Sequence, residues 1–172
     1  MDVKVYISFE RPAFLLPLLP MISQTSEYAL RAVVFLGNEG VPRTAAEISR
    51  SVKAPPDYLS KVMRGLVREG IVVSRRGLHG GFTLAREPDE LSVLDVINAV
   101  DPLQRIRECP LGNKAHGENL CTLHRTIDET LARAEGTFRQ VTVGQLLGEE
   151  KGARTCPFPI PCGKRARKAC GQ

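Results

Sequence analysis

The sequence predicts a mainly α protein with a small β-hairpin, and three observations predict it. Amphipathic helical patterns are separated by turn residues, two short apolar segments enclose a glycine-rich basic turn, and a long helical pattern follows them. The chain has 172 residues, which fits one domain plus appendages. Its 42% hydrophobic and 25% charged residues are ordinary globular values and exclude a wholly disordered or collagen-like chain.

The first two helices are predicted from their capping residues. Ser23 or Thr25 can cap a helix with a periodic apolar face, and the turn residues 37–40 end it. Thr44 and Glu47 have capping-box spacing, in which each side chain satisfies a backbone N–H near the other residue. A short second helix is therefore expected, ending near residue 52.

The third helix is predicted to begin at Pro56, a residue favoured in a first turn, and to end at Gly70. Its apolar positions recur at helical spacing and predict one buried face: Leu59, Val62, Met63, Leu66 and Val67. The opposite face carries Tyr58, Ser60, Lys61, Arg64 and Arg68. This face is expected to point to solvent or to a polar partner.

A β-hairpin is predicted after this helix, with strands over residues 71–74 and 81–84. Its tip is basic and rich in glycine, a residue that permits positive φ angles and close backbone approach. Helix, helix, helix and hairpin, in this order over residues 21–101, are typical of a winged helix-turn-helix. The third helix would then enter the major groove of double-stranded DNA, and the hairpin tip would contact phosphates or a narrow minor groove.

The candidate DNA-binding residues are those on the polar face of the third helix and at the hairpin tip: Tyr58, Ser60, Lys61, Arg64, Arg75, Arg76 and His79. The net charge of +5 permits an anionic partner without selecting one. Each cation taken alone is as consistent with a solvated basic surface as with a DNA contact. Their combination with the helix order favours DNA binding over that simpler interpretation.

A fourth helix is predicted from Ser92, which has capping-box spacing with Asp95. Residues 102–121 are predicted to form a loop, and residues 122–147 a long helix with a last turn capped by Thr142. The long helix has near-heptad apolar spacing, the pattern of a helix that packs on another helix: Leu123, Ile127, Leu131, Ala134 and Phe138. Gly136 is expected to weaken it by about 1 kcal/mol and to allow fraying.

Both ends of the chain are expected to lie outside this fold. Residues 1–20 are predicted to be a disordered N-terminal extension before a natural start at Met21, although a short strand is an equal alternative. Residues 148–172 are predicted to be a disordered basic tail with three cysteines, Cys156, Cys162 and Cys170. No segment is apolar over the roughly 20 residues that cross a bilayer, so we expect a cytoplasmic protein with no membrane partner.

Catalysis is not predicted. The sequence contains no nucleophile-elbow, phosphate-loop or dinucleotide-binding pattern. Its glycines at 77, 80 and 81 lie within a predicted hairpin and not between a strand and a helix, so they do not form a phosphate-binding loop. The alternative outside the regulator class is a winged-helix adaptor that binds protein and no DNA.

Four segments of the chain resemble the Rrf-two type of bacterial transcription regulators, over residues 21 to about 147. They are residues 26–32, 58–63, 74–85 and 95–101, which contain the motifs SEYALRA, YLSKVM, SRRGLHGGFTLA and DVINAVD. The family includes iron–sulfur cluster regulators and nitric-oxide-sensitive repressors. The resemblance implies a winged-helix homodimer whose long helix serves dimerisation. It also implies sequence-specific DNA binding, usually repression, and in many members a regulatory cluster.

The resemblance makes the loop 102–121 a candidate sensor loop, with one departure from the family pattern. Cys109 and Cys121 match the first and third of the usual cysteines, whereas His116 replaces the second. Some relatives supply an acidic ligand from the first helix of the other subunit, which corresponds to Glu27. These four residues are a candidate ligand set for a [2Fe–2S] cluster, with His124 as a further candidate.

Three interpretations of the loop stay open. Two cysteines and two histidines can also bind zinc, although their spacing is unusual for a zinc site. The cysteines can instead form a thiol redox pair, or bind nothing. Glu27 alone is equally consistent with a solvated carboxylate in a first helical turn, which the helix dipole favours.

Overall fold

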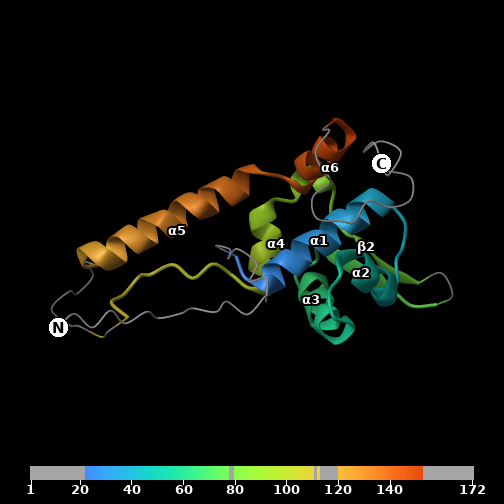
Figure 1. The fold of residues 1–172 in the computed structure, drawn as a ribbon, viewed down its shortest axis with the longest axis horizontal. Helices are drawn as coiled ribbons and strands as arrows, with labels where there is room; N and C mark the ends of the chain where they lie inside the picture. Colours follow the sequence, from blue (N-terminus) through green and yellow to red (C-terminus); the bar gives the residue numbers. More distant parts are fainter. Residues whose placement is uncertain (1–21, 78–79, 111, 113–119, 153–172) are drawn as a thin grey trace, which may run out of the picture.

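The computed structural model of the chain describes residues 22–77, 80–110, 112 and 120–152 (Figure 1). Three helices and an antiparallel hairpin come first: α1 (Gln24–Glu39), α2 (Ala45–Val52), α3 (Pro56–Arg68), β1 (Val72–Arg75) and β2 (Gly81–Leu84). A 3-10 turn η1 and three helices follow: η1 (Pro88–Glu90), α4 (Val93–Val100), α5 (Thr122–Gln140) and α6 (Val143–Gly152). The predicted mainly helical winged fold with a long C-terminal helix is confirmed.

The helix starts follow from the capping residues. Ser23 accepts a hydrogen bond from the backbone N–H of Ser26 at the start of α1, so Ser23 rather than Thr25 is the cap. Thr44 and Glu47 form the predicted capping box of α2, and the hydrogen bonds from Thr44 lower the pKa of Glu47. Ser92 and its box partner begin α4 in the same way. Each box satisfies backbone N–H groups that a helix start leaves without partners.

The core lies where α1, α2, α3 and α4 meet. Leu59, Val62, Met63 and Leu66 of α3 are buried against it, as predicted. Val67, predicted on the same face, is 37% exposed, so the prediction is wrong at this position. Burial of this aliphatic face fixes the opposite face of α3 toward solvent.

The hairpin is joined to the helices through the backbone of Arg43. The N–H of Arg43 donates to the carbonyl of Phe82 at 3.0 Å, and the N–H of Phe82 donates to the carbonyl of Arg43 at 2.8 Å. Gly81 lies against the same backbone with a φ of 147°, and a Cβ there would be 2.7 Å from the Arg43 carbonyl oxygen. The close approach therefore requires glycine at position 81.

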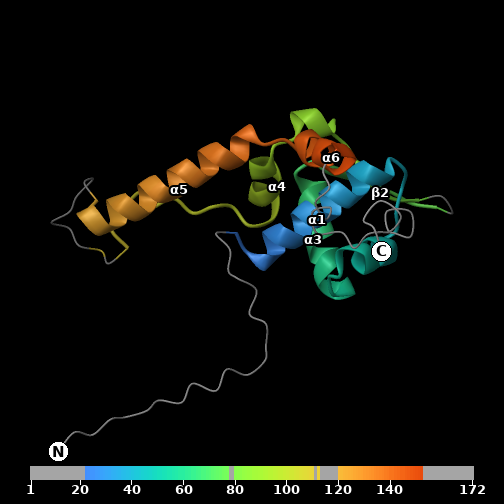
Figure 2. The same cartoon turned by 45° about the horizontal axis from the view of Figure 1, so that its top comes forward.

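The long helix α5 projects away from the other helices (Figures 1 and 2). Its C-terminal end is attached through a short extended connection to α6. The N–H of Val93 donates to the carbonyl of Val141 at 2.9 Å, and the N–H of Val143 donates to the carbonyl of Leu91 at 2.8 Å. These two bonds anchor the base of α5 to the start of α4.

Several element boundaries differ from those predicted. α1 ends at Glu39 with Gly40 as its left-handed cap, within the predicted turn residues 37–40, but Gly37 itself is helical and lies beside Leu147 of α6. β1 includes Arg75, so this residue belongs to the strand rather than to the tip. α5 is continuous through Gly136, and the expected fraying there is not observed. The last turn, predicted to end at 147, extends to Gly152.

Some predictions fall outside the described residues, namely those on the extension 1–20, on His79 and His116, and on the three cysteines of the tail. Among the residues that the structure describes, none of the helices combines the length and apolar character needed to cross a membrane.

Candidate DNA interface and sensor loop

The polar face of α3 is the first candidate site. Ser60, Lys61 and Arg64 are exposed on the side of α3 opposite the core. Ser60 Oγ donates to the carbonyl of Pro56 at 2.9 Å, and Arg64 Nε donates to the carbonyl of Ser60 at 3.3 Å. In the part of the chain that the structure describes, neither Lys61 nor Arg64 forms an ion pair. Both cations are therefore available to an anionic partner.

Tyr58 connects this face to the start of α1. Its hydroxyl and Thr25 Oγ1 are 2.5 Å apart and share a hydrogen bond. Its ring lies edge-on to the ring of Tyr28, with centroids 5.8 Å apart. The side chain is 36% exposed, so one edge remains accessible while the other holds α1 against α3. Sequence reasoning placed Tyr58 on the polar face and missed this second role, which depends on a residue 33 positions away.

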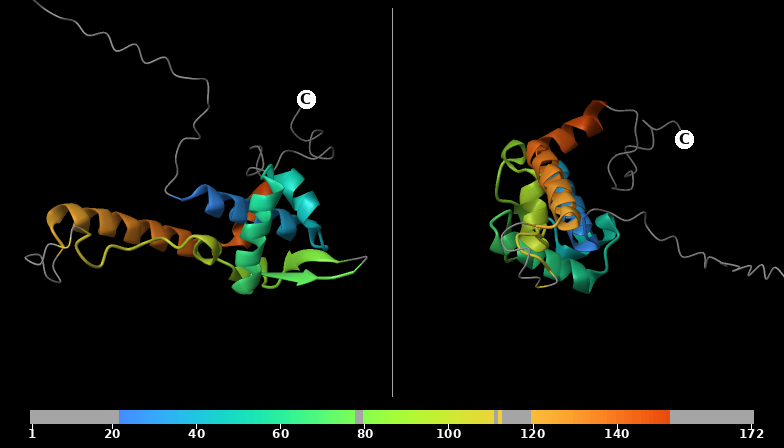
Figure 3. Two further views of the ribbon diagram at one scale, coloured as in Figure 1. Left: turned by 90° about the horizontal axis from the view of Figure 1, so that it is seen from below. Right: turned by 90° about the vertical axis from the view of Figure 1, so that its left-hand side faces the viewer.

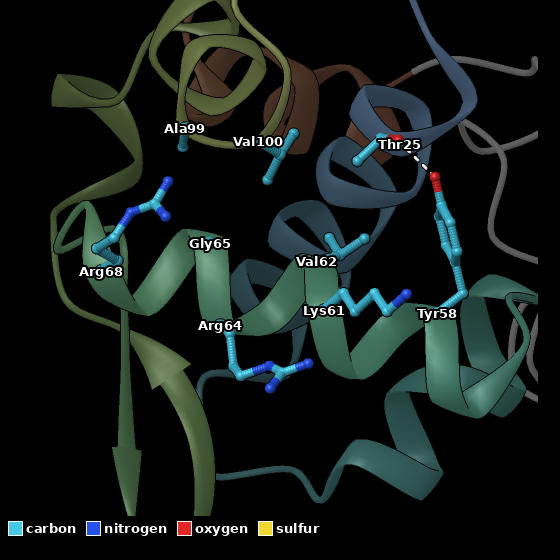
Figure 4. A pocket seen from close by; sticks show the side chains of 9 residues that line it. All are labelled: Thr25, Tyr58, Lys61, Val62, Arg64, Gly65, Arg68, Ala99 and Val100. Carbon is cyan, nitrogen blue, oxygen red and sulfur yellow. Dashed lines mark hydrogen bonds between the residues drawn. The ribbon is translucent and has the colours of Figure 1, made fainter.

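An open cavity of about 580 Å³ runs beside α3 (Figure 4). Thr25 of α1, the side chains of α3 and the C-terminal residues Ala99 and Val100 of α4 line it. Figure 4 shows Arg68 pointing toward Ala99, whereas Arg64 points to the opposite side of α3. Arg68 also pairs with Glu69 at 3.1 Å. Lys61, Arg64 and Arg68 all line this open cavity, and their side chains leave α3 in different directions.

The hairpin adds two exposed arginines to this side of the fold. Arg75, at the end of β1, and Arg76, directly after it, are both exposed. β1 packs against α3, so the hairpin begins next to the helix whose polar face is exposed. The structure thus describes six of the seven candidate DNA-binding residues and leaves their polar atoms near or at the surface.

Residues 102–110, the first part of the candidate sensor loop, run antiparallel to α5 (Figure 3), and Arg105 fastens them to that helix. Arg105 donates from Nε and Nη2 to the two carboxylate oxygens of Asp128, at 2.7 and 2.6 Å, and from Nη1 to Glu135 at 3.2 Å. The backbone N–H of Ile106 also donates to Asp128, at 2.9 Å. The hydrogen bonds from Arg105 lower the pKa of Asp128, with partial burial opposing them and the N–H of Ile106 adding to them. Sequence reasoning missed this cluster, because its members lie 23 and 30 residues apart.

The two ends of the loop carry the candidate metal ligands. Cys121 is the N-cap residue of α5, and its Sγ lies 3.3 Å from Nδ1 of His124, one helical turn further on. Cys109 opens a turn in which the N–H of Gly112 donates to the Cys109 carbonyl at 2.9 Å. Cys121 and His124 thus form a soft sulfur and nitrogen donor pair, which suits iron and zinc.

The four-residue ligand set is not assembled within the described residues. No three His, Cys, Asp or Glu side chains among them lie close enough together to hold a metal ion. Glu27 lies in the first turn of α1 and pairs there with Arg31. The start of α1, which carries Glu27, lies apart from the N-terminal end of α5 within one chain (Figure 1). The structure favours His124, the further candidate, as the neighbour of Cys121.

Comparisons with known proteins agree with this architecture. The sequence model of Rrf2, described as an iron-dependent transcriptional regulator, matches residues 22–149. A protein of Aquifex aeolicus (strain VF5), assigned by its name to the HTH-type transcriptional regulators, is 30% identical over 135 residues, which cover 76% of this chain and 94% of that protein. The HTH-type transcriptional regulator IscR of Cronobacter sakazakii is 27% identical over 132 residues, with coverage of 76% and 82%.

Solved structures share the fold. The structure of T. potens IscR has a TM-score of 0.62 at 21% identity and covers 80% of this chain and 93% of that one. The structure of CymR, the global cysteine regulator of B. subtilis, has a TM-score of 0.61 at 20% identity, with coverage of 76% and 98%.

Proposed function

This chain belongs to the Rrf2 family of transcriptional regulators, and we propose that it represses transcription as a homodimer that reads two DNA half-sites. It is a DNA-binding regulator of the helix-turn-helix type and not an enzyme. We assign sequence recognition to α3 and phosphate binding to the hairpin. A regulator that binds DNA acts in the compartment that holds the DNA, which we propose is the cytoplasm.

The exposed polar face of α3 carries the proposal. Ser60, Lys61 and Arg64 extend from a helix whose other face is held in the core, so their direction is fixed before DNA arrives. Such side chains hydrogen-bond base edges in the major groove, which an α-helix fits. Arg75, Arg76 and His79 are assigned to the backbone or the minor groove, where they set position more than sequence.

The apolar face of α5 supports the homodimer. Leu123 is 64% exposed and Ile127 is 41% exposed in the single chain, on a helix that projects from the rest of the fold. Leu131, Ala134 and Phe138 continue the same near-heptad line. A second copy packed on this line would bury the exposed Leu123 and Ile127, whereas Ala134 is already buried and Phe138 already packs against the core in the single chain. The second copy would also place two α3 helices for half-sites roughly 34 Å apart.

The sensor loop supports regulation by iron. We assign Cys109, Cys121 and His124 as ligands of a [2Fe–2S] cluster, completed by His116 or by Glu27 of the second copy. Zinc is the alternative occupant of the same donors. A bound cluster would supply a redox-active centre whose charge changes with its oxidation state. Because the loop lies along α5, a change in the loop reaches the helix that sets the spacing of the two α3 helices.

DNA binding is tested with a charge-matched pair of variants. Arg64→Ala removes a cation from α3, and Arg139→Ala removes one from the exposed side of α5. Gel shifts on the DNA upstream of the protein's own coding sequence, repeated over a salt series, should show weaker binding for Arg64→Ala. If Arg64 contacts a phosphate, the slope of log affinity against log salt should fall by about 1. Arg139→Ala should bind like the wild type.

Two results would oppose these assignments. Equal losses for both variants would show that α3 is not the reading element, and no shift at any salt would favour the adaptor alternative. Iron analysis of the anaerobically purified protein tests the cofactor. Bound iron that is lost in Cys109→Ser and Cys121→Ser supports the assigned ligands, whereas an iron-free protein that resists reconstitution contradicts them.

A further inference from the structure

Arg105 does more than form a surface ion pair, because its contacts include the backbone of the loop. Asp128 receives both the guanidinium of Arg105 and the N–H of Ile106, so one carboxylate holds a side chain and the adjacent peptide. Glu135 holds the opposite edge of the same guanidinium. Three hydrogen bonds from one planar group to two fixed carboxylates define its position and orientation, which a single ion pair does not.

The residues that hold the loop lie on the same face of α5 as the donor pair at its start. Cys121, Asp128 and Glu135 follow one another at intervals of seven residues. Seven residues are close to two helical turns, so these side chains form one stripe that drifts by only about 20° per step. His124 lies next to this stripe, one turn from Cys121. The loop is therefore fastened to the face that also carries the thiol and the imidazole.

The lengths along the two chain segments match. From Asp128 back to Cys121, α5 spans about 10.5 Å at roughly 1.5 Å per residue. From Ile106 to Cys109, the chain bends at Glu108, so the segment spans at most about 10 Å, the fully extended limit of roughly 3.4 Å per residue. The loop runs toward the start of α5 and turns at Cys109, where Gly112 donates back to its carbonyl. With Ile106 held at Asp128, the segment is long enough for Cys109 to lie near the level of Cys121 along the helix axis.

We infer that Arg105 is a positioning residue that sets the register of the sensor loop on α5, so that Cys109 is held near the axial level of Cys121 and His124. A slip of one residue would displace Cys109 by about 3.4 Å along the axis, more than the length of a metal–sulfur bond. The clamp sets the axial level, and it does so without a metal. The inference deepens the proposed sensor role of the loop and rests on that role for its purpose, whereas the register itself is independent of DNA.

The register can be measured by bridging the two thiols. In a protein with Cys156, Cys162 and Cys170 replaced by serine, Cys109 and Cys121 are the remaining cysteines. A short bis-maleimide joins two thiols as thioethers, and peptide mapping separates bridged from singly modified chains. Arg105→Gln removes the three guanidinium hydrogen bonds and leaves the N–H of Ile106 as a single bond to Asp128, which alone is too weak to fix the loop. The next fixed point is Leu103, which packs against the core, so the free segment before Cys109 lengthens from about three to about six residues. Bridging relative to single modification should then fall about threefold.

Matched variants separate positioning from general stability. Arg86→Gln removes an exposed arginine that lies 3.7 Å from Asp95 and donates to the carbonyl of Glu90, away from the loop, and should bridge like the parent. Asp128→Asn should lower bridging as Arg105→Gln does. Arg105→Lys, which keeps the charge but lacks the fork, should lie between the parent and Arg105→Gln. Far-UV circular dichroism identifies any variant that is not folded, and Asp128→Asn serves if Arg105→Gln is the one that fails.

The inference is overturned if folded Arg105→Gln and Asp128→Asn bridge as fast as the parent, or if Arg86→Gln falls as far as they do. Gel shifts on the same proteins keep the two proposals apart. A parent that bridges in an Arg105-dependent way but binds no DNA would contradict the proposed function and leave the register intact. A parent that binds DNA but bridges independently of Arg105 would contradict the inference about the register and leave the proposed function intact.

Discussion

The contact between Gly81 and Arg43 predicts how the hairpin is held against the helices. In Gly81→Ala, the new Cβ would lie 2.7, 2.8 and 3.0 Å from the carbonyl oxygen, carbonyl carbon and nitrogen of Arg43. These are backbone atoms, so the strand must move away, and the two hydrogen bonds between Arg43 and Phe82 are strained or lost. Each such bond contributes about 1 kcal/mol, and alanine at this φ costs about 1–3 kcal/mol.

Gly81→Ala should therefore lower the free energy of unfolding by about 3–5 kcal/mol, the sum of these contributions. Gly77→Ala is the matched control, because Gly77 also has a positive φ, 116°, but nothing lies within 4 Å of its Cβ position. It should show the conformational cost alone. Urea unfolding followed by far-UV circular dichroism gives both values. DNA affinity should also fall further in Gly81→Ala, because the hairpin loses its place beside α3.

The comparison between the two glycines decides the outcome. If Gly81→Ala and Gly77→Ala destabilise the protein equally, the contact with Arg43 contributes nothing beyond backbone strain, and the hairpin is held in another way. A stable Gly81→Ala protein with normal DNA binding would refute the required close approach altogether.

Two further predictions concern α5. Gly136→Ala should raise the free energy of unfolding by about 1 kcal/mol in urea unfolding, because nothing lies within 4 Å of the Cβ position and alanine favours the helix; a destabilised variant would contradict this. The hydrogen bonds from Arg105 lower the pKa of Asp128 in the folded protein below its ordinary value of 3.8. The ion pair therefore stabilises the fold above pH 3.8, and this stabilisation is lost as the pH falls through the pKa that Asp128 has in the folded protein. The gap in unfolding free energy between the wild type and Asp128→Asn should thus narrow below pH 3.8, and a gap that widened on acidification would refute the assignment.

Local sequence patterns predicted most elements because their signals act over a few residues. The capping boxes at Thr44 and Ser92 and the apolar periodicity of α3 each depend on neighbours within about two turns. Boundaries were predicted less well where distant segments decide them. Gly37, predicted as a turn residue, lies inside α1 beside Leu147 of α6, more than a hundred residues further along the chain.

The candidate site divides in the same way. The polar face of α3 was predictable from spacing, whereas the second role of Tyr58 depends on Thr25, and the fastening of the loop depends on Arg105 meeting Asp128 and Glu135. None of these contacts has a periodic signature in the sequence, because their partners come together only when the chain folds back on itself.

The sequence by itself determined the winged-helix fold, the exposed polar face of α3 and the family assignment. Helix periodicity, caps and glycine-rich turns depend on residues that are close together in the sequence. Only the tertiary structure decided how the loop lies on α5 and which donor accompanies Cys121. The physical reason is that a fork of hydrogen bonds needs two carboxylates at fixed positions, and those positions exist only on the folded helix.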